Sequence, residues 1–519
     1  MALVRKTWDF HQPHFLSIQG SDSSRLGVDY ADGVDTRWPD QVTLGPHIQS
    51  LSLSAAGGTA ANVNGIADSG GMNATAYLYL IRGTKWAKVR ASDMTLISDG
   101  TETALAEDAT CILRTSNGTT EEISIGMNAT AYRVISTVSA LATDTHSANN
   151  EGQVARILAR AFPGNRIFAG QPSGTVIKQN DLRSATMDAS AYTTRATLTG
   201  ENLRFTGFAL DGKYWIVGTS NGPYVFNNDD LRFRPIIEEI DNTLNASASG
   251  WQNCTNMMYW SFAGVLCPLT KRLRRIVNID GGESVGPEAF VEWNRSPVQG
   301  YATAQAGSDQ WLYAVFLNPV TGLSWLCAGR PREAGDWHSN FLSWYVIAQL
   351  SSACDALYYA GQLGGRTLPT FIGGAGSNAM FWGDGRLSVY PDDTSYPYAA
   401  SGTVYLTKIR FGPQLRGKLK GIRLKTANLS SARTIAINVA VDGRAAAQFG
   451  ATLNDANAHQ DGWHGVDDFL GEQFEGEEFQ ISLTFTGSAA GATTSPKVIG
   501  DLDAVFDVTE WAGPYAGVM

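Results

Sequence analysis

Histidine and carboxylate side chains that could hold a metal ion occur at two places in the chain. His11 and His14 lie in the stretch HQPH, and His459 and His464 lie in HQDGWH, close to Asp461. Histidine nitrogens and carboxylate oxygens are common zinc ligands. Neither pair is joined by a third group of ligands, so histidines in surface turns are the favoured explanation. We therefore expect no metal site and no cofactor.

Carboxylates that could act in pairs are concentrated in NNDDLRFRPIIEEIDN, which carries Asp229, Asp230, Glu238, Glu239 and Asp241. Two acids facing each other across a cleft are sufficient for glycoside hydrolysis. A solvated acidic loop is the favoured alternative, because neighbouring acids are usually exposed. The sequence also lacks H-E-x-x-H, a P-loop and the S-x-D-x-G-x-T-W repeat of sialidases. We expect a protein that is not an enzyme.

The one concentrated basic run is TKRLRR, in which Lys271, Arg272, Arg274 and Arg275 carry the charge. On a strand these side chains would alternate between two faces. They could contact DNA or an acidic neighbouring subunit. A charged edge strand that prevents unwanted strand pairing is the somewhat favoured alternative. If the protein assembles into a ring, this run is the first candidate for a subunit contact.

Tryptophan is abundant, with 14 residues in the chain. Sugar rings stack on aromatic faces, so an exposed tryptophan in a cleft would favour glycan binding. The tryptophans that we single out for this role are Trp251, Trp260, Trp293, Trp337 and Trp344.

Composition points to strands and turns. Glycine makes up 55 of 519 residues, and charged residues make up only 17%, against about 25% in typical domains. A net charge of −10 argues against a protein that coats nucleic acid, although it leaves room for one local basic site. The length suggests two to four folding units of about 100–200 residues.

The cysteines and the hydropathy of the chain further restrict the kind of protein that this can be. The five cysteines lie far apart and form no C-x-x-C pair, so we expect buried thiols rather than disulfides or a zinc cluster. No run approaches about 18 apolar residues, and the N-terminus has no apolar signal region. We expect synthesis in a cytoplasm and no membrane span.

Short apolar runs separated by Asn-Gly, Asp-Gly and Ser-Gly recur along the chain. These dipeptides tolerate the positive φ angles of tight hairpin turns. Amphipathic helices are nearly absent, so the pattern predicts an all-β fold.

One phrase, GMNATAY, occurs at Gly71–Tyr77 and Gly126–Tyr132, with a looser copy, TMDASAY, at Thr186–Tyr192. The methionines are 55 and 60 residues apart (127 − 72 and 187 − 127). All-β units that recur every ~40–55 residues match the blades of a β-propeller. We interpret the phrase as an equivalent strand-and-turn position in successive blades, in preference to a repeated ligand contact. Six or seven blades would fill the chain to about residue 395.

The pattern changes near residue 401, where longer alternating strands begin. In AINVAVDGR the residues Ile437, Val439 and Val441 are expected to point inward, followed by a turn at Asp442 and Gly443. Such strands indicate a β-sandwich or jelly roll. We therefore divide the chain into an N-terminal extended arm with the first strands (1–50), a propeller-like repeat domain (51–395) and a C-terminal β-sandwich (401–519).

The stretch GVDYADGVDTRWPDQVTLGP (Gly27–Pro46) resembles the start of structural proteins from tailed bacteriophages, and GTVYLTKIRFG (Gly402–Gly412) resembles the start of their last module. The resemblance implies a tail component of the virion: a tip, fibre base, adaptor, nozzle-like subunit or receptor-binding protein. It implies assembly as a homo-oligomer with other tail or portal-vertex proteins, after synthesis in the host cytoplasm. Symmetric assembly adds interfaces that stabilise such proteins.

Two main hypotheses follow. The first is a structural tail protein that acts by symmetric assembly and without catalysis. The second is a tail receptor-binding protein for host attachment, which binds or cleaves a host surface glycan on the propeller face. A cellular propeller lectin is a third, less favoured possibility, because no signal peptide is present.

Overall fold

The computed structural model describes residues 2–53 apart from 9, 11–24 and 39, and residues 61–136 apart from 71–74, 98–103, 117–120 and 128–132. Between 157 and 307 it describes the strands alone. It then describes 311–383 apart from 319 and 332–341, and 396–510 apart from 413–414, 458–460 and 465–473. The regular elements among these residues are strands and short 3-10 segments such as η6 (Leu363–Gly365), with no α-helix among them. The all-β prediction is confirmed.

Seven antiparallel sheets follow one another along the described chain between residues 49 and 383. The first two contain β7 (Gly65–Asp68), β8 (Tyr77–Arg82), β9 (Lys85–Arg90) and β10 (Thr95–Ile97), then β11 (Ala109–Ser116), β12 (Glu121–Met127) and β13 (Arg133–Ser136). The third and fourth contain β14 (Ile157–Ala161), β15 (Arg166–Gly170), β16 (Val176–Asp181) and β17 (Tyr192–Thr197), then β18 (Phe205–Asp211), β19 (Tyr214–Thr219), β20 (Gly222–Asn227) and β21 (Arg232–Pro235).

The remaining three sheets complete the series. They contain β22 (Ala263–Cys267), β23 (Arg272–Val277) and β24 (Asp280–Ser284), then β25 (Tyr301–Gly307), β26 (Leu312–Leu317), β27 (Ser324–Pro331) and β28 (Leu342–Leu350), and finally β29 (Leu357–Gly361), β30 (Thr370–Ala375), β31 (Asn378–Gly383) and β6 (Gln49–Leu51). Within each sheet the strands pair as consecutive hairpins, and only β6 is taken from elsewhere in the chain.

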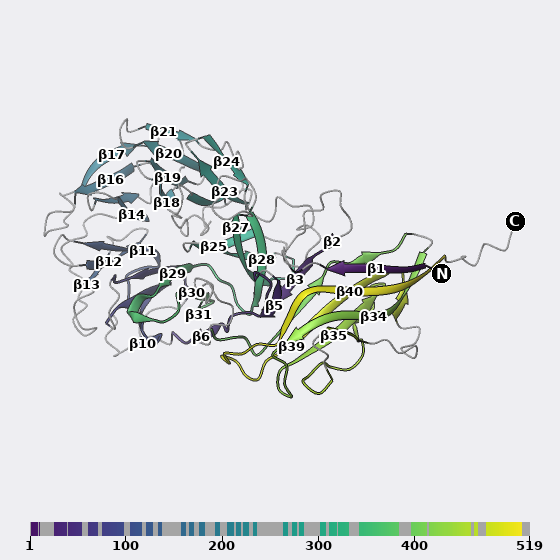
Figure 1. Ribbon diagram of the computed structural model, residues 1–519. Helices are drawn as coiled ribbons and strands as arrows, with labels where there is room; N and C mark the ends of the chain where they lie inside the picture. The colour runs from purple at the N-terminus through teal and green to yellow at the C-terminus, as the bar shows by residue number, and fades with distance from the viewer. Residues whose placement is uncertain are drawn as a thin grey trace.

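Contacts between neighbouring sheets close the series into a ring (Figure 1). The first strands of the first five sheets contact one another in order: β7, β11, β14, β18 and β22. The fifth sheet contacts the sixth through β23 and β25, and the sixth contacts the seventh through β25 and β29. Finally, β29 contacts β7 of the first sheet. Buried apolar clusters fill the spaces between the sixth and seventh, seventh and first, and first and second sheets. The strand β6 pairs with β31, so a segment that precedes the first sheet completes the last one. We call these seven sheets the ring.

Two further sheets lie beside the ring and are built from both ends of the chain. One contains β1 (Ala2–Trp8), β2 (Arg25–Leu26), β4 (Val34–Asp35), β5 (Gln41–Leu44), β34 (Leu415–Ala427), β37 (Asp461–His464), β38 (Glu475–Gly476) and β40 (Lys497–Glu510). The other contains β3 (Val28–Asp32), β32 (Ser401–Leu406), β33 (Ile409–Arg410), β35 (Thr434–Val441), β36 (Ala447–Gln448) and β39 (Glu478–Thr486). We call them the two-sheet unit.

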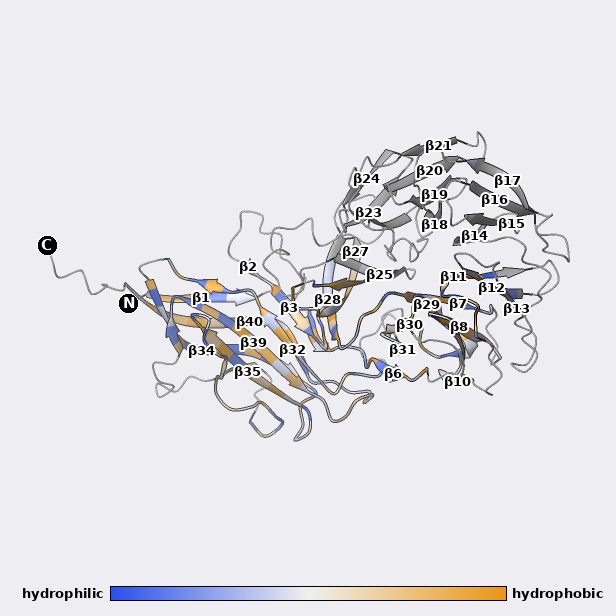
Figure 2. Ribbon diagram, turned by 180° about the vertical axis from the view of Figure 1, so that it is seen from behind, coloured by the Kyte–Doolittle hydropathy of each residue, from blue (hydrophilic) through white to orange (hydrophobic). Residues whose placement is uncertain are grey.

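A single apolar core joins the two sheets of this unit. Residues from both, such as Trp8, Phe506, Ile437 and Phe479, are fully or almost fully buried in one cluster. Hydrophobic and hydrophilic residues alternate along its strands (Figure 2). In β35 the predicted inward residues are buried, and Asp442 and Gly443 follow with φ angles of 49° and 72°. Two positive φ angles in a two-residue turn are the hairpin geometry that the Asp-Gly pair predicted.

The ring is therefore an insertion between the N-terminal and C-terminal strands of the two-sheet unit. The sequence predicted the long C-terminal strands, but it did not predict that β1, β3 and β5 pair with them. In the structure β1 pairs along its whole length with β40, and β3 pairs with β32.

The repeated phrase does not mark equivalent positions, and that prediction is wrong. Tyr77 begins β8, the second strand of its sheet, whereas Tyr192 begins β17, the fourth strand of its sheet. Tyr132 lies outside the described residues. The first strands of the first three sheets begin at Gly65, Ala109 and Ile157, so the sheets recur every 44 and 48 residues (109 − 65 and 157 − 109). A phrase that recurs every 55 and 60 residues slips by about one strand per sheet.

Candidate functional site at the junction between the ring and the two-sheet unit

The stretch that follows β3 fastens the two-sheet unit to the sixth sheet of the ring. The outer strand of that sheet, β28, runs alongside β3. The backbone N–H of Gly33 donates to the carbonyl oxygen of Ile347 at 3.0 Å, and the N–H of Gln349 donates to Oδ1 of Asp32 at 2.8 Å. These bonds occupy part of the edge of β28, which would otherwise offer unpaired groups to another strand.

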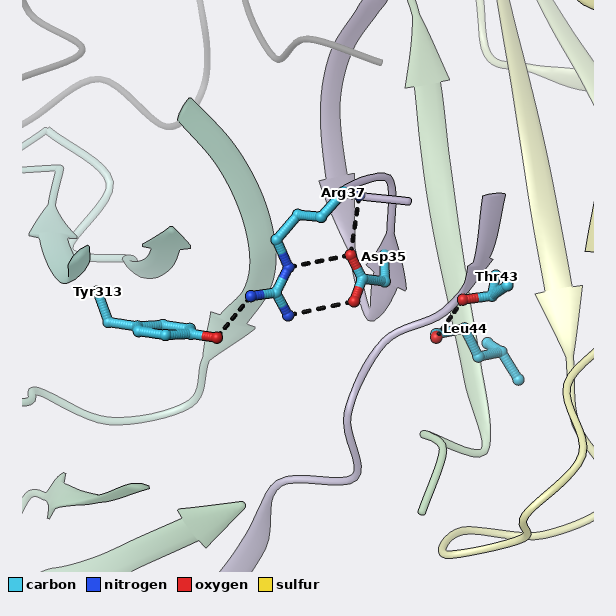
Figure 3. Close-up of polar contacts among 5 residues, drawn as sticks. All are labelled: Asp35, Arg37, Thr43, Leu44 and Tyr313. Carbon is cyan, nitrogen blue, oxygen red and sulfur yellow. Dashed lines mark hydrogen bonds and ion pairs between the residues drawn. The ribbon is translucent and has the colours of Figure 1, made fainter. Parts of the chain in front are cut away.

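An ion pair with no solvent exposure lies a few residues further on. The side chains of Asp35 and Arg37 are both 0% exposed. Arg37 donates from Nε to Oδ1 of Asp35 at 3.0 Å and from Nη2 to Oδ2 at 3.1 Å, while its backbone N–H donates to Oδ1 at 3.0 Å (Figure 3). Such two-pronged pairing matches the planar guanidinium to the carboxylate. The short D-x-R spacing lets one loop supply both charges.

The third donor group of Arg37 points into the ring. Its Nη1 donates to the hydroxyl oxygen of Tyr313 on β26 at 2.5 Å (Figure 3). The guanidinium carbon also lies 5.1 Å from the centre of the aromatic side chain of Trp311 and 5.5 Å from the centre of that of Tyr313. Cation–π contacts of this kind are stronger when the cation is removed from water. Arg37 therefore connects a loop of the two-sheet unit to the aromatic core of the ring.

That aromatic core spans two sheets of the ring. Tyr313 lies 4.3 Å from Phe371 and 6.0 Å from Trp382, measured between ring centres, and both partners belong to the seventh sheet. The contact chain from Asp35 thus runs through Arg37 and Tyr313 into the seventh sheet. A shift of the two-sheet unit against the ring would break the Arg37–Tyr313 hydrogen bond and the cation–π contacts and would leave a buried donor without its acceptor, so these contacts favour one relative arrangement of the two parts.

Aromatic side chains form a second contact at the same junction. Tyr30 on β3 stacks on Tyr405 with ring centres 4.2 Å apart and meets Trp325 of the ring edge-on at 6.1 Å. Burial, with help from the nearby Tyr405, raises the pKa of Tyr30 far above its ordinary value. Burial also raises the pKa of Asp29 to about 6 and raises that of Asp32.

The groups at the junction hold the two parts of the protein together. The charged groups of Asp35 and Arg37 are occupied by each other and by Tyr313, and the groups that meet there are backbone amides, aromatic rings and one ion pair. Among the described residues, no group of three or more His, Cys, Asp and Glu side chains could hold a metal ion.

The basic run falls on the fifth sheet of the ring. Arg272, Arg274 and Arg275 lie in β23, and Lys271 lies outside the described residues. β23 pairs with β22 on one side and with β24 on the other, so the explanation as an edge strand is wrong. Arg275 stands opposite Glu283 in the register, a cross-strand position at which opposite charges are favourable.

The predicted glycan-binding tryptophans are not brought together by the described part of the structure. Trp344 is 1% exposed on β28, packs edge-on against Phe316 with ring centres 5.7 Å apart, and lies against Gly329. Its side chain faces inward because of strand alternation, so its assignment to a sugar-binding face is wrong. Trp251, Trp260, Trp293 and Trp337 lie outside the described residues.

The other candidates from the sequence are only partly described. The acids Asp229, Asp230, Glu238, Glu239 and Asp241 and the histidines His11, His14 and His459 lie outside the described residues, and His464 is described only as part of β37.

The cysteine prediction is confirmed for two of the five residues. Cys327 and Cys354 are buried free thiols, and burial raises the pKa of Cys354 to about 12 and that of Cys327 well above its usual value. Cys111 is also a free thiol, but it is partly exposed.

The sequence analysis did not identify Asp35, Arg37 or Tyr313 as a functional group. Asp35 and Arg37 lie inside the stretch Gly27–Pro46 that the sequence analysis singled out, but their types and spacing did not indicate a buried pair. The sequence around Tyr313 carries no signal of this contact, because Tyr313 and Arg37 are 276 residues apart in the chain.

No protein-family model matches the chain, and no curated protein matches it. Solved structures show distant similarity. The crystal structure of Chaetomium thermophilum Raptor has 7% identity and a TM-score of 0.42 over 65% of this chain, which spans only 29% of that protein. YCF48 from Cyanidioschyzon merolae has 8% identity and a TM-score of 0.41 over 66% of this chain and 100% of that one. The β-propeller domain of Myceliophteria thermophila Cps50 (Swd1) has 9% identity and a TM-score of 0.39 over 65% and 99%.

Across the described ranges, no helix is long and apolar enough to cross a membrane.

Proposed function

We propose that the chain is a structural component of a bacteriophage tail, which acts by symmetric assembly with copies of itself and with other tail or portal-vertex proteins. In this proposal the ring is a seven-bladed β-propeller and the two-sheet unit is a β-sandwich. The protein uses these as one rigid block and carries out no catalysis.

The observation that supports this proposal most directly is the position of the stretch that resembles phage structural proteins. Its residues Asp32, Gly33 and Arg37 make the hydrogen bonds that fasten the two-sheet unit to the ring. A subunit that transmits force between neighbours needs its parts held in one arrangement. The hydrogen bond from Arg37 to Tyr313 supplies part of that constraint, because a shift between the two parts would leave a buried donor of Arg37 without its acceptor.

The closed series of sheets supports the propeller. Each sheet contacts the next one along the chain, through its first strand in every sheet but the fifth, and β6 completes the last sheet beside β31. A strand that precedes the first sheet in the chain is hydrogen-bonded to the last sheet, so the first and last sheets are held together by backbone pairing. The shared core between the sheets of the two-sheet unit supports a sandwich in the same way.

The proposal is tested by the mass and shape of the purified full-length chain. We expect one discrete oligomer by light scattering, and rings or other symmetric particles in negative stain, at micromolar concentration. A monomer throughout the accessible concentration range, together with no binding to other tail proteins, would contradict it. Binding on a glycan array or clearing of a polysaccharide layer would instead favour the receptor-binding alternative, which would then require the four tryptophans other than Trp344.

We further propose that the basic run is a contact with a neighbouring subunit. A variant with Lys271, Arg272, Arg274 and Arg275 changed to Gln is expected to lower the oligomer mass while the ring stays folded by circular dichroism. If the oligomer is unchanged but binding to duplex DNA is lost, the run contacts DNA. If neither changes, the run has no role in assembly.

A further inference from the structure

Asp29 occupies an irregular position in the strand that fastens the two parts of the protein. In the pairing of β3 with β32, Val28 stands opposite Leu406 and Tyr30 stands opposite Tyr405. Asp29 is therefore the extra residue of a β-bulge. The side chain of Asp29 is half-buried.

The hydrogen bonding of the Asp29 carboxylate is sparse. Nε2 of Gln480 on β39 donates to its Oδ2 at 3.1 Å. The positive charge of Lys408 is near enough to favour the ionised form. However, the Lys408 ammonium group forms an ion pair with Oε1 of Glu478 at 3.1 Å, and Glu478 is also paired with Arg410. The lysine is therefore shared with a second carboxylate.

The other titratable groups around Asp29 do not favour its charge. Tyr30 and Tyr405 stack beside it, and Asp32 adds a second partly buried carboxylate to the same strand. Burial outweighs the opposing effects of Lys408 and Gln480, and it raises the pKa of Asp29 to about 6. At neutral pH the strand therefore carries an ionised group that its surroundings disfavour.

The contacts next to Asp29 are those that fasten the ring. The neighbouring residue, Tyr30, meets Trp325 of the ring, and Asp32 accepts the hydrogen bond from the backbone of Gln349. We propose that Asp29 is an acid-responsive switch of the junction: uptake of a proton by its carboxylate tightens the attachment of β3 to β28 and so stiffens the link between the ring and the two-sheet unit.

The direction of the effect follows from linkage. A carboxylate whose pKa is higher in the folded state than in the unfolded state costs stability when it is ionised. The cost is present above pH 6 and disappears as the pH falls through 6 toward the value of an unfolded aspartate, about 3.9. The junction should therefore become more stable as the pH is lowered from 7.5 to 5.

The test compares the full-length protein with Asp29→Asn, which copies the uncharged form. Asp455→Asn, at an exposed turn of the two-sheet unit, is the matched control. Two measurements are made at pH 7.5 and pH 5: the thermal midpoint of unfolding, and hydrogen exchange of peptides from β28 by mass spectrometry. Comparing proteins at one pH removes the intrinsic pH dependence of exchange.

At pH 7.5 we expect Asp29→Asn to unfold at a higher temperature than the wild type and to exchange the β28 amides more slowly, by between about tenfold and a hundredfold, because one pKa unit corresponds to a tenfold change in an equilibrium constant. At pH 5, which lies between the folded-state pKa of about 6 and the unfolded value of about 3.9, both differences should be about half as large on a free-energy scale. Asp455→Asn should match the wild type throughout. Equal exchange of β28 in both proteins at pH 7.5, or a lower midpoint at both pH values, would overturn the proposal.

A second variant acts on the same group without removing it. Gln480→Leu deletes the hydrogen bond that favours the ionised carboxylate. The pH at which the wild type gains stability should move upward in this variant. An unchanged pH of transition would also overturn the proposal, even if Asp29→Asn did not fold.

Discussion

The hydroxyl of Tyr358 donates a hydrogen bond to the carboxylate of Asp68 at the place where the last sheet of the ring meets the first. The same carboxylate pairs with Nη1 of Arg114 at 2.5 Å, so it connects β29, β7 and β11, the first strands of three consecutive sheets. Burial, together with the negative charge of Asp68, raises the pKa of Tyr358 well above its usual value. The tyrosine therefore remains a donor across the ordinary pH range.

Removing this hydroxyl should weaken the closure of the ring. Tyr358→Phe is expected to lower the free energy of unfolding by about 1–3 kcal/mol, because it leaves a carboxylate without one of its donors. Urea denaturation measures the loss. In a double-mutant cycle with Asp68→Asn, the combined loss should be smaller than the sum of the single losses. Strictly additive losses would show that the two groups do not stabilise one another.

Breaking the buried ion pair should be costly, and replacing both partners should be much less so. Arg37→Met leaves Asp35 charged and buried, and we expect a loss of about 3–5 kcal/mol. The double variant Asp35→Leu with Arg37→Met removes both charges and should recover most of that loss. Arg410→Met is the control, since Arg410 pairs with Glu478 at the surface, and its loss should stay within about 1 kcal/mol. A double variant as unstable as Arg37→Met would refute the explanation by unpaired charge.

Gly33 is expected to be irreplaceable for two separate reasons. Its φ is +65°, and a Cβ atom there would lie 2.7 Å from the backbone oxygen of Ser401. Gly443 has a similar φ of +72° but open space around the Cβ position. Gly443→Ala should cost about 1–2 kcal/mol through backbone conformation alone, and Gly33→Ala should cost clearly more, because it adds a clash with backbone. Equal thermal midpoints for the two variants would contradict this expectation.

Asp503 should stabilise the two-sheet unit only while it is ionised. Burial acts to raise its pKa, but hydrogen bonds from Arg5 and Thr7 and the charge of Arg5 more than offset burial, so the pKa is lowered overall. A carboxylate with a lowered folded-state pKa contributes stability above its unfolded value of about 3.9, and that contribution is lost as the pH falls through the folded value. Asp503→Asn should therefore unfold earlier than the wild type at pH 7, and the difference should shrink as the pH falls below about 3.9. Thermal scans across this range measure the difference, and a constant difference at every pH would exclude the charge as its origin.

The local features of the fold were predictable from the sequence. Alternation in β35 gave the buried set Ile437, Val439 and Val441, and the Asp-Gly pair gave the turn that follows. These features depend on residues that are adjacent in the chain. The slip of the GMNATAY phrase shows the limit of such reasoning, because a hairpin turn of the same composition serves equally well between any two strands of a sheet.

The features that decide the candidate site were not predictable in this way. Trp344 was assigned to a surface because tryptophan type alone does not tell which face of a strand is covered. Arg37 and Tyr313 are 276 residues apart, and nothing in either local sequence specifies the other. The pairing of β1 with β40 is equally distant, and several C-terminal strands present the same alternating pattern to a potential partner.

The insertion of the ring between the two ends of the two-sheet unit has a consequence for synthesis. Arg5 on β1 reaches its partner Asp503 on β40 across 498 residues, which a ribosome adding about 5–20 residues per second translates in roughly 25–100 seconds. Every described strand of the ring, by contrast, has been synthesised once Gly383 is added. We expect the ring to fold first, while β1 is still unpaired because β40 has not been synthesised. During this interval the exposed N-terminal strand is the segment that we expect chaperones to bind.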